Sequence, residues 1–342
     1  MHFLITGHTG FKGSWLSLLL HHKGHTVSGI SLDPIQDSLF EQARIFNIFE
    51  NDVRLDIRNS KKLSEAIEKI NPEVIIHLAA QPLVRVSYRE PIATYEVNVL
   101  GTLNVLESTK NLQNLLATLV ITTDKVYKNV GHLRGYVESD ELGGDDPYSA
   151  SKAAADIATQ SWVKSFAKNP VAIARAGTVI GGGDWSEDRL IPDIFYAFSK
   201  GKLPKLRYPN SIRPWQHVLD CVNGYVMLVE KMISTNVGGE WNFGPNFDEK
   251  YSVSDVTETF AELWGLSKNV KNWNLDNSDS YKEASYLLLD SNKARSELLW
   301  KDHFDFKSAL ESTVNWYKAF LNGETVAITN QQIEDYLAFF KS

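Results

Sequence analysis

Tyr148 and Lys152 stand four residues apart in the segment YSASK, and this pair could take part in the oxidation of an alcohol. On a helix, side chains at this spacing lie one turn apart on the same face. A phenol has an unperturbed pKa of about 10, but a nearby ammonium group favours the phenolate and lowers that pKa. A phenolate can remove the proton of a hydroxyl while hydride leaves the same carbon for a nicotinamide. Because the same spacing also arises by chance on helix surfaces, the pair gains weight only from the motifs around it.

A second group of reactive side chains, Thr123-Asp124-Lys125, directly follows an apolar run at 117–122 that is typical of a buried strand. Side chains at the carboxyl end of a parallel strand can reach a ligand at the edge of the sheet. The three residues offer a hydroxyl, a carboxylic acid and an amine. Alcohol oxidation needs only the hydroxyl, so the acid and the amine indicate a further proton transfer. The alternative is a turn that carries a solvated Asp-Lys pair.

A glycine-rich turn near the start of the chain, TGHTGFKG, predicts a site for a dinucleotide phosphate. It follows the apolar run 3–5 and precedes a helical pattern over 11–22. Gly7 allows a tight turn, Gly10 lets the backbone approach a pyrophosphate at the helix N-terminus, and Gly13 brings helix and strand together. The spacing is GxxGxxG rather than GxGxxG, and three glycines alone are weak evidence.

A carboxylate supports the dinucleotide interpretation, because Asp33 follows the second strand pattern at 26–31, twenty residues after Gly13. A carboxylate at this place can accept hydrogen bonds from the ribose hydroxyls of adenosine. No Arg or Lys follows Asp33 closely to hold a 2′-phosphate, which favours NAD over NADP. Weaker signals are Asp56-Ile57, which could hold the adenine edge, and the small residues after the fourth strand, where a cofactor would cross closely.

Composition limits the class of protein. The chain has 342 residues, of which 43% are hydrophobic and 23% charged, as in an ordinary globular protein with an ample core. The net charge of −7 argues against nucleic acid as a partner. The chain begins almost at once with a strand, which leaves no room for a signal peptide, and no apolar run is long enough to span a membrane. With Cys221 as the only cysteine we expect a reducing, cytoplasmic setting, and the histidines show no metal-ligand spacing, so we assign no metal.

Strand and helix patterns alternate through the first half of the chain, which predicts a doubly wound α/β fold with a parallel sheet covered on both faces. The expected strands are 3–5, 26–31, 52–55, 73–78, 117–122 and 171–176, and the expected helices are 11–22, 60–70, 92–110 and 148–168. The pattern changes after Gly177, and further helices are expected at 254–264, 306–321 and 331–340. We expect residues 1–176, joined by part of 218–243, to bind the dinucleotide, and residues 177–342 to form mainly a smaller substrate lobe.

Several longer segments resemble the extended short-chain dehydrogenase/reductases and, within them, the CDP-glucose 4,6-dehydratases. They are GHTGFKGSW from Gly7, HLAAQPLVR from His77, TDKVY from Thr123, GGGDW from Gly181, DRLIPD from Asp188 and RPWQHV from Arg213. The similarity covers almost the whole chain. Its most specific element is Asp124-Lys125, where sibling dehydratases carry Asp-Glu. The resemblance implies a Rossmann-like fold with a smaller C-terminal lobe, and tightly held NAD.

The resemblance also implies a reaction without net oxidation. A nucleotide sugar is oxidised at C4, water is lost across C5 and C6, and hydride returns to C6, as in the biosynthesis of deoxysugars for lipopolysaccharide O-antigen. Tyr148 would be the C4 base, Lys152 its electrostatic partner and Thr123 a hydrogen-bond partner of the C4 oxygen. Asp124 would protonate the leaving hydroxyl. Lys125 stands where the siblings' Glu removes the C5 proton, and would either act as a deprotonated base or stabilise the enolate.

Ligand contacts follow from the same resemblance. The expected NAD contacts are Gly7, Thr9, Gly10, Phe11, Lys12, Gly13, Asp33, Asp56, Ile57, Leu78, Ala79, Ala80, Tyr148 and Lys152. The expected nucleotide-sugar contacts are Gln81, Arg85, Thr178, Arg189, Arg213 and Lys282. The family usually has Asn at the position of Thr178 and His at that of Lys282, so the nucleotide base and the exact sugar stay open. A homo-oligomer, dimer or tetramer, is also expected.

Two other functions compete with this one. The first is an enzyme for another nucleotide sugar, a dehydratase or a 4-epimerase; an epimerase needs no acid beside Thr123. The second is an NAD-sensing protein that kept the fold and lost the chemistry. Such proteins commonly lose the Tyr or the Lys of the YxxxK pair, and this chain has both.

Overall fold

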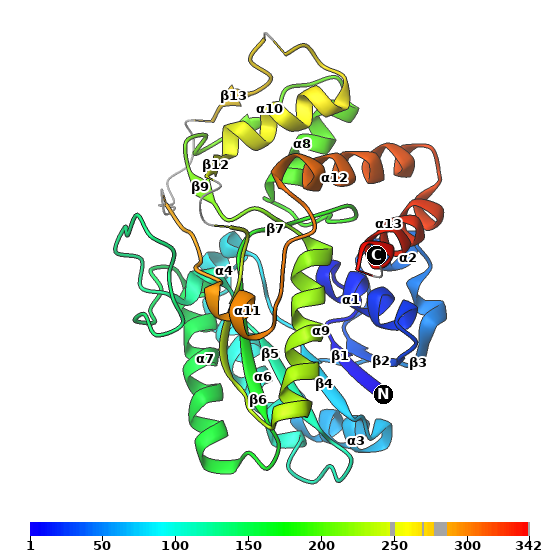
Figure 1. Ribbon diagram of the computed structural model, residues 1–342, viewed down its shortest axis with the longest axis vertical. Coiled ribbons are helices and arrows are strands. Elements are labelled where there is room, and N and C mark those ends of the chain that lie inside the picture. The colour runs from blue at the N-terminus through cyan, green and yellow to red at the C-terminus, as the bar shows by residue number, and fades with distance from the viewer. Residues whose placement is uncertain (247–249, 269, 277–285, 341–342) are drawn as a thin grey trace.

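The computed structural model describes residues 1–246, 250–268, 270–276 and 286–340. Figure 1 shows a sheet with helices on both sides and, above it, a smaller lobe. Three helices of that lobe are α8 (Leu190–Ser199), α10 (Val253–Trp264) and α12 (Phe306–Leu321).

A parallel seven-stranded sheet organises the larger part of the described chain. Its strands are β1 (His2–Thr6), β2 (Thr26–Ser31), β3 (Phe49–Arg54), β4 (Val74–His77), β5 (Ala117–Ile121), β6 (Val171–Ala176) and β11 (Gly239–Phe243). Their order is β11-β6-β5-β4-β1-β2-β3, and every neighbouring pair is parallel. The chain reverses direction across the sheet at β1, the kind of switch point at which ligands bind in such folds. The predicted doubly wound α/β fold is confirmed.

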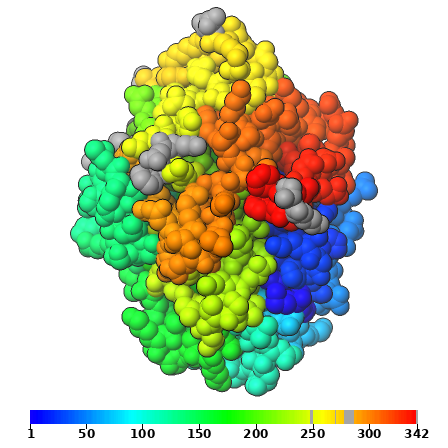
Figure 2. Space-filling view, in the orientation of Figure 1, coloured from blue at the N-terminus to red at the C-terminus, as the bar shows by residue number. Residues whose placement is uncertain are grey.

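Helices cover both faces of this sheet because its central strands are apolar on both sides. α1 (Phe11–His22) and α9 (Val218–Thr235) pack on one face, and α3 (Ser60–Ile70), α6 (Gly101–Ser108) and α7 (Pro147–Phe166) lie on the other. α1 is buried nearly all round, since α9 and the C-terminal helix α13 (Thr325–Phe339) also contact it. Figure 2 shows the red C-terminal segment lying against the blue N-terminal one.

The smaller lobe is built from paired short strands and helices. The strand pairs are β7 (Val179–Ile180) with β10 (Gln216–His217), β8 (Lys205–Leu206) with β13 (Asn274–Leu275), and β9 (Ile212–Arg213) with β12 (Tyr251–Ser252). The remaining helices of the described chain, most of them outside this lobe, are α2 (Leu39–Gln42), α4 (Val84–Arg89), α5 (Pro91–Tyr95), α11 (Asn292–Glu297) and the one-turn segments η1 (Ile45–Ile48), η2 (Glu96–Leu100) and η3 (Asp124–Val126). Aromatic rings join the parts of the lobe; Trp185, for example, contacts Phe195 and Phe320. The expected division of the chain at residue 177 stays a prediction.

Three of the expected elements differ from the structure by an interruption or by three residues or more. The helix expected over 92–110 is interrupted by η2, which has π-helical hydrogen bonding. β3 begins at Phe49 rather than residue 52, and α13 begins at Thr325 rather than residue 331. Within the part of the chain that the structure describes, no helix is long and apolar enough to cross a bilayer.

Candidate active site

A cavity of about 1620 Å³ opens at the carboxyl edge of the sheet, where the smaller lobe meets it. Its wall includes residues that directly follow β1, β2, β3, β4, β5 and β6, so six strand ends converge on one space. The predicted site residues that line it are Gly7, Thr9, Gly10, Phe11, Lys12, Gly13, Asp33, Asp56, Ile57, Leu78, Ala79, Ala80, Arg85, Thr123, Asp124, Lys125, Tyr148, Lys152, Thr178, Arg189 and Arg213.

The glycine turn leaves no room for side chains. Gly7 has φ +76°, a left-handed conformation that favours glycine, and a Cβ there would lie 2.7 Å from the Ala79 nitrogen. A Cβ on Gly13 would lie 2.2 Å from the Gly7 oxygen. α1 begins at Phe11, so its first backbone N–H groups open on the cavity beside a bare glycine turn. Phosphate groups fit such a helix N-terminus.

The end of β2 carries the carboxylate expected to bind ribose. The side chain of Asp33 is 89% exposed and lines the cavity. The Nε atom of Arg54 lies 3.6 Å from Asp33, although the sequence around Asp33 contains no nearby cation. Arg54 comes from β3 and also pairs with Asp52, whose Oδ1 is 2.7 Å from the Nε2 of the buried His8. Sequence reasoning missed Arg54, because only strand pairing brings it beside Asp33.

Tyr148 and Lys152 lie near the start of α7 and are both buried. The Nζ of Lys152 donates to the Ile121 carbonyl at 2.8 Å. Burial lowers the pKa of Lys152 to about 8, and the positive charge of Lys12 contributes. Burial raises the pKa of Tyr148, against the charge of Arg189 and a hydrogen bond with Thr123.

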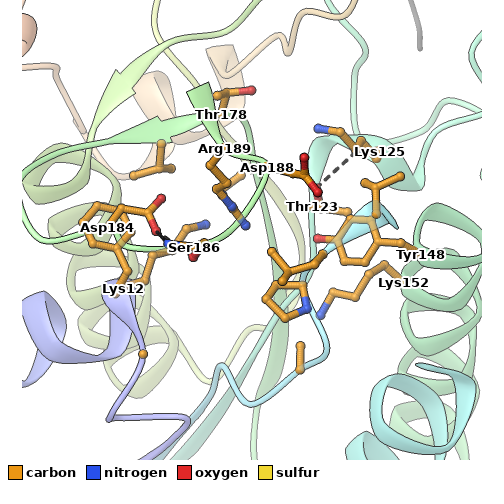
Figure 3. A pocket seen from close by; sticks show the side chains of 18 of the residues that line it. Lys12, Thr123, Lys125, Tyr148, Lys152, Thr178, Asp184, Ser186, Asp188 and Arg189 are labelled. Carbon is orange, nitrogen blue, oxygen red and sulfur yellow. Dashed lines mark hydrogen bonds between the residues drawn. The ribbon is translucent and has the colours of Figure 1, made fainter. Parts of the chain in front are cut away.

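The positive charge of Arg189 opposes the effect of burial on the pKa of Tyr148. The electrostatic role expected for Lys152 beside Tyr148 stays a prediction. Figure 3 shows Arg189 projecting into the middle of the cavity, with Lys12 on one side and Tyr148 and Lys152 on the other. The smaller lobe thus supplies a guanidinium that faces the phenol on α7.

The turn after β5 holds a carboxylate in an unusual setting. Asp124 is 1% exposed, and its Oδ1 accepts hydrogen bonds from Thr123 Oγ1 at 2.9 Å and Lys125 Nζ at 3.2 Å. Its other oxygen, Oδ2, is buried and has no hydrogen-bond partner among the described residues. Because an unsatisfied buried carboxylate oxygen is costly, its retention in a cavity wall points to a ligand group. Thr123 caps η3 and so fixes the turn.

Arginines and carboxylates gather on the side of the cavity that the smaller lobe forms. Arg85 of α4 and Arg207, beyond β8, lie 3.6 and 3.1 Å from the same oxygen of Asp188. Burial raises the pKa of the adjacent Asp193 to about 6, against the positive charges of Arg207 and Arg85. Asp188 adopts φ +59°, a left-handed conformation that Asp tolerates better than most residues. Asp188 and Asp193 belong to the DRLIPD segment that carries the family resemblance, but neither carboxylate was an expected ligand contact.

Among the predicted contacts that the structure describes, Gln81 does not line the cavity. It lies between Ala80 and Pro82, which do, and its side chain bonds Thr94 Oγ1 and the Leu83 nitrogen at 2.9 and 2.6 Å. Its amide therefore shapes the loop after β4. Lys282 lies outside the described residues.

The sequence matches a known protein family over most of its length. The family model for GDP-mannose 4,6 dehydratase matches residues 4–313. The chain belongs to that family. A relative from Salmonella typhimurium, CDP-glucose 4,6-dehydratase, is 42% identical over 98% of this chain and 95% of its own length.

Solved structures share the fold of this family member. One is a dTDP-glucose 4,6-dehydratase from Bacillus anthracis in complex with NAD, with a TM-score of 0.80 and 24% identity over 94% of this chain and 98% of that one. Another is a UDP-glucose-4-epimerase from Stenotrophomonas maltophila with bound NAD, with a TM-score of 0.84 and 18% identity over 94% and 99%. At these identities the likeness concerns the fold.

Proposed function

We propose that this protein is an NAD-dependent CDP-glucose 4,6-dehydratase, a lyase that forms CDP-4-keto-6-deoxyglucose and water. The observation that carries the proposal is the buried Asp124, whose Oδ2 lacks a partner among the described residues and whose neighbours are Thr123 and Lys125. Oxidation or epimerisation at C4 needs no such acid. The 42% identical relative supports CDP-glucose as the substrate.

The part of the cavity beside the glycine turn and Asp33 fits a dinucleotide. The bare glycine turn at the N-terminus of α1 suits the pyrophosphate, and Asp33 suits the adenosine ribose. When bound, NAD supplies the acceptor for the hydrogen that leaves C4 and returns to C6. Lys152 and Tyr148 line the same cavity.

Residues on α7 and in the turn after β5 would carry out the oxidation at C4. Tyr148 would take the C4 hydroxyl proton as general base, and Thr123 would bond the same oxygen. Burial opposes the phenolate, and the positive charge of Arg189 and the hydrogen bond with Thr123 act in its favour. Lys152, hydrogen-bonded to Ile121, would hold its charge near the reacting groups.

Asp124 and Lys125 would catalyse the loss of water. The Nζ of Lys125 lies 3.2 Å from Asp124 Oδ1, so one proton can be shared between them. With the amine neutral and the acid protonated, Lys125 would take the C5 proton while Asp124 gives its proton to the departing C6 hydroxyl. The C6–O bond breaks, a C5–C6 double bond forms, and water leaves. When hydride returns to C6, C5 would take a proton from the Lys125 ammonium, and the proton that Tyr148 removed from the C4 hydroxyl would pass to Asp124, so that all three groups regain their starting state.

The arginines of the smaller lobe suit the substrate diphosphate. Arg189, Arg207 and Arg213 line the cavity there, and Arg85 faces them from α4. Guanidinium groups bind phosphate oxygens by paired, charge-assisted hydrogen bonds. Arg207 adds to the contacts expected from the sequence. The homo-oligomer stays a prediction.

A panel of nucleotide sugars tests the proposal. CDP-, dTDP-, UDP- and GDP-glucose would each be incubated with the protein and NAD, and the products weighed by mass spectrometry. We expect loss of one water from CDP-glucose and much slower loss from the others. Water loss from a different nucleotide sugar, or inversion at C4 without a change in mass, would contradict the assignment.

NAD should bind more tightly than NADP. A 2′-phosphate would meet the carboxylate of Asp33, and like charges about 4 Å apart repel by roughly 1–4 kcal/mol. Arg54 offsets part of this repulsion, but it also pairs with Asp52. We therefore expect a dissociation constant at least about fivefold lower for NAD, measured by titration. Equal or tighter binding of NADP would refute the role given to Asp33.

A further inference from the structure

A fully buried ion pair lies behind the catalytic turn. Arg175 of β6 and Asp156 of α7 are 1% and 0% exposed, and the guanidinium donates from Nε and Nη2 to the two carboxylate oxygens at 2.8 Å each. Burial acts to lower the pKa of Arg175, but its hydrogen bonds with Asp156 raise that pKa above the usual value. Because desolvation offsets the attraction in buried pairs, stability alone does not explain this one.

The pair is hydrogen-bonded to the residues on both sides of the turn. Thr122, just before Thr123, donates from Oγ1 to Asp156 Oδ2 at 3.3 Å. Tyr127, just after η3, accepts at its hydroxyl from Arg175 Nη1 at 2.9 Å. The segment that carries Asp124 and Lys125 is therefore hydrogen-bonded to Asp156 at one end and to Arg175 at the other.

Tyr127 extends these contacts to the edge strand of the sheet. Its hydroxyl donates to Asn242 Oδ1 of β11 at 2.7 Å, and burial raises the pKa of this phenol, which keeps it a donor. Asn242 Nδ2 in turn donates to the Tyr136 and Asp290 carbonyls at 2.8 and 3.1 Å. The hydroxyl of Tyr127 thus has both a donor and an acceptor, as in a network that rigidifies its surroundings.

The same ion pair also reaches the other catalytic residues. Asp156 lies four residues after Lys152 and eight after Tyr148 on α7, so the three side chains share a helix face. One carboxylate is therefore rigidly linked both to the helix that carries the oxidation residues and to the turn that carries the elimination residues.

We propose that Arg175 and Asp156 are positioning residues that hold Asp124 and Lys125 in register with Tyr148 and Lys152, acting through Thr122 and Tyr127. The inference rests on the proposed dehydratase function. Loosening one end of the turn should slow water loss far more than oxidation at C4, because the base Tyr148 and its partner Lys152 lie on α7 and only Thr123 serves the oxidation from the turn. A defect in stability alone would slow both steps in parallel.

Tyr127→Phe tests this proposal, because it removes the hydroxyl and keeps the ring that lines the cavity. We expect water loss to slow by about 10- to 100-fold, the range that a misplacement near 1 Å can cause. The KM for CDP-glucose and the rate of C4 oxidation should change less than about threefold. Rapid-quench mass spectrometry should then show a 4-keto sugar that retains its C6 oxygen.

Two further variants complete the test. Tyr336→Phe is the control, because it removes another buried phenol that does not line the cavity and that donates to Asp220 Oδ1 at 3.0 Å. This variant should accumulate no 4-keto sugar that retains its C6 oxygen. Thr122→Val loosens the other end of the turn and should reproduce the accumulation, which protects the test if Tyr127→Phe folds poorly. The positioning role is wrong if the wild type dehydrates CDP-glucose but both turn variants slow oxidation and water loss equally. It is also wrong if both turn variants slow neither step. If the wild type forms no dehydrated product, the proposed function fails first.

Discussion

Tyr148→Phe should reduce turnover of CDP-glucose by at least about 10²–10⁴-fold, the usual contribution of a general base. The change removes only the hydroxyl, while the buried ring keeps its place at the start of α7. NAD binding should therefore stay within about threefold of the wild-type value. Steady-state kinetics measures the first effect, and titration with NAD measures the second.

Tyr95→Phe is a suitable control, since Tyr95 lies in α5 outside the cavity wall. It should behave as the wild type in both measurements. A Tyr148→Phe protein that retains wild-type turnover would remove this phenol from the mechanism. Loss of NAD binding in parallel with turnover would instead indicate a disrupted cavity.

Asp124→Asn should separate oxidation from dehydration. The amide cannot protonate the departing C6 hydroxyl, so water loss should slow by about 10²–10⁴-fold. Oxidation at C4 depends on Tyr148 and should persist, so nicotinamide absorbance should rise and a 4-keto sugar that keeps its C6 oxygen should accumulate. The substitution keeps the shape of a side chain whose Oδ1 accepts from Thr123 and Lys125.

Asp335→Asn provides the matched change at an exposed carboxylate on α13, where no effect on either step is expected. If Asp124→Asn slowed the rise in absorbance as much as water loss, Asp124 would not be the acid of the elimination. An oxidation-only or epimerase mechanism would then explain the site better.

Local patterns predicted six of the seven strands of the sheet, but not the edge strand β11. The bounds expected for α1, β2 and β6 are those observed, because a glycine turn and short polar loops delimit a helix and two largely buried strands. The helix expected over 92–110 was broken by a long-range contact. Buried Asn98 bonds the Gln81 backbone and Ser151 Oγ across the structure, and η2 is the local irregularity that accommodates it.

The site was predictable where it follows strand ends and less so where distant segments meet. Thr123, Asp124 and Lys125 sit directly after β5, so sequence order alone placed them at the cavity. Arg54 reached Asp33 only through strand pairing, and the contact between Arg207 and Asp188 depends on the packing of the smaller lobe. The proximity of Arg189 to Tyr148 was not expected for the same reason, because Arg189 belongs to the smaller lobe and Tyr148 to α7.

CDP-glucose labelled with deuterium at C4 tests the central claim most directly. The proposed reaction oxidises C4 and reduces C6 with the same hydrogen, at one site and without release of the sugar in between. We expect a product that has lost one water and carries the deuterium at C6, formed with no net consumption of NAD. A product that retains deuterium at C4, lacks it altogether, or keeps its full oxygen count would contradict the account.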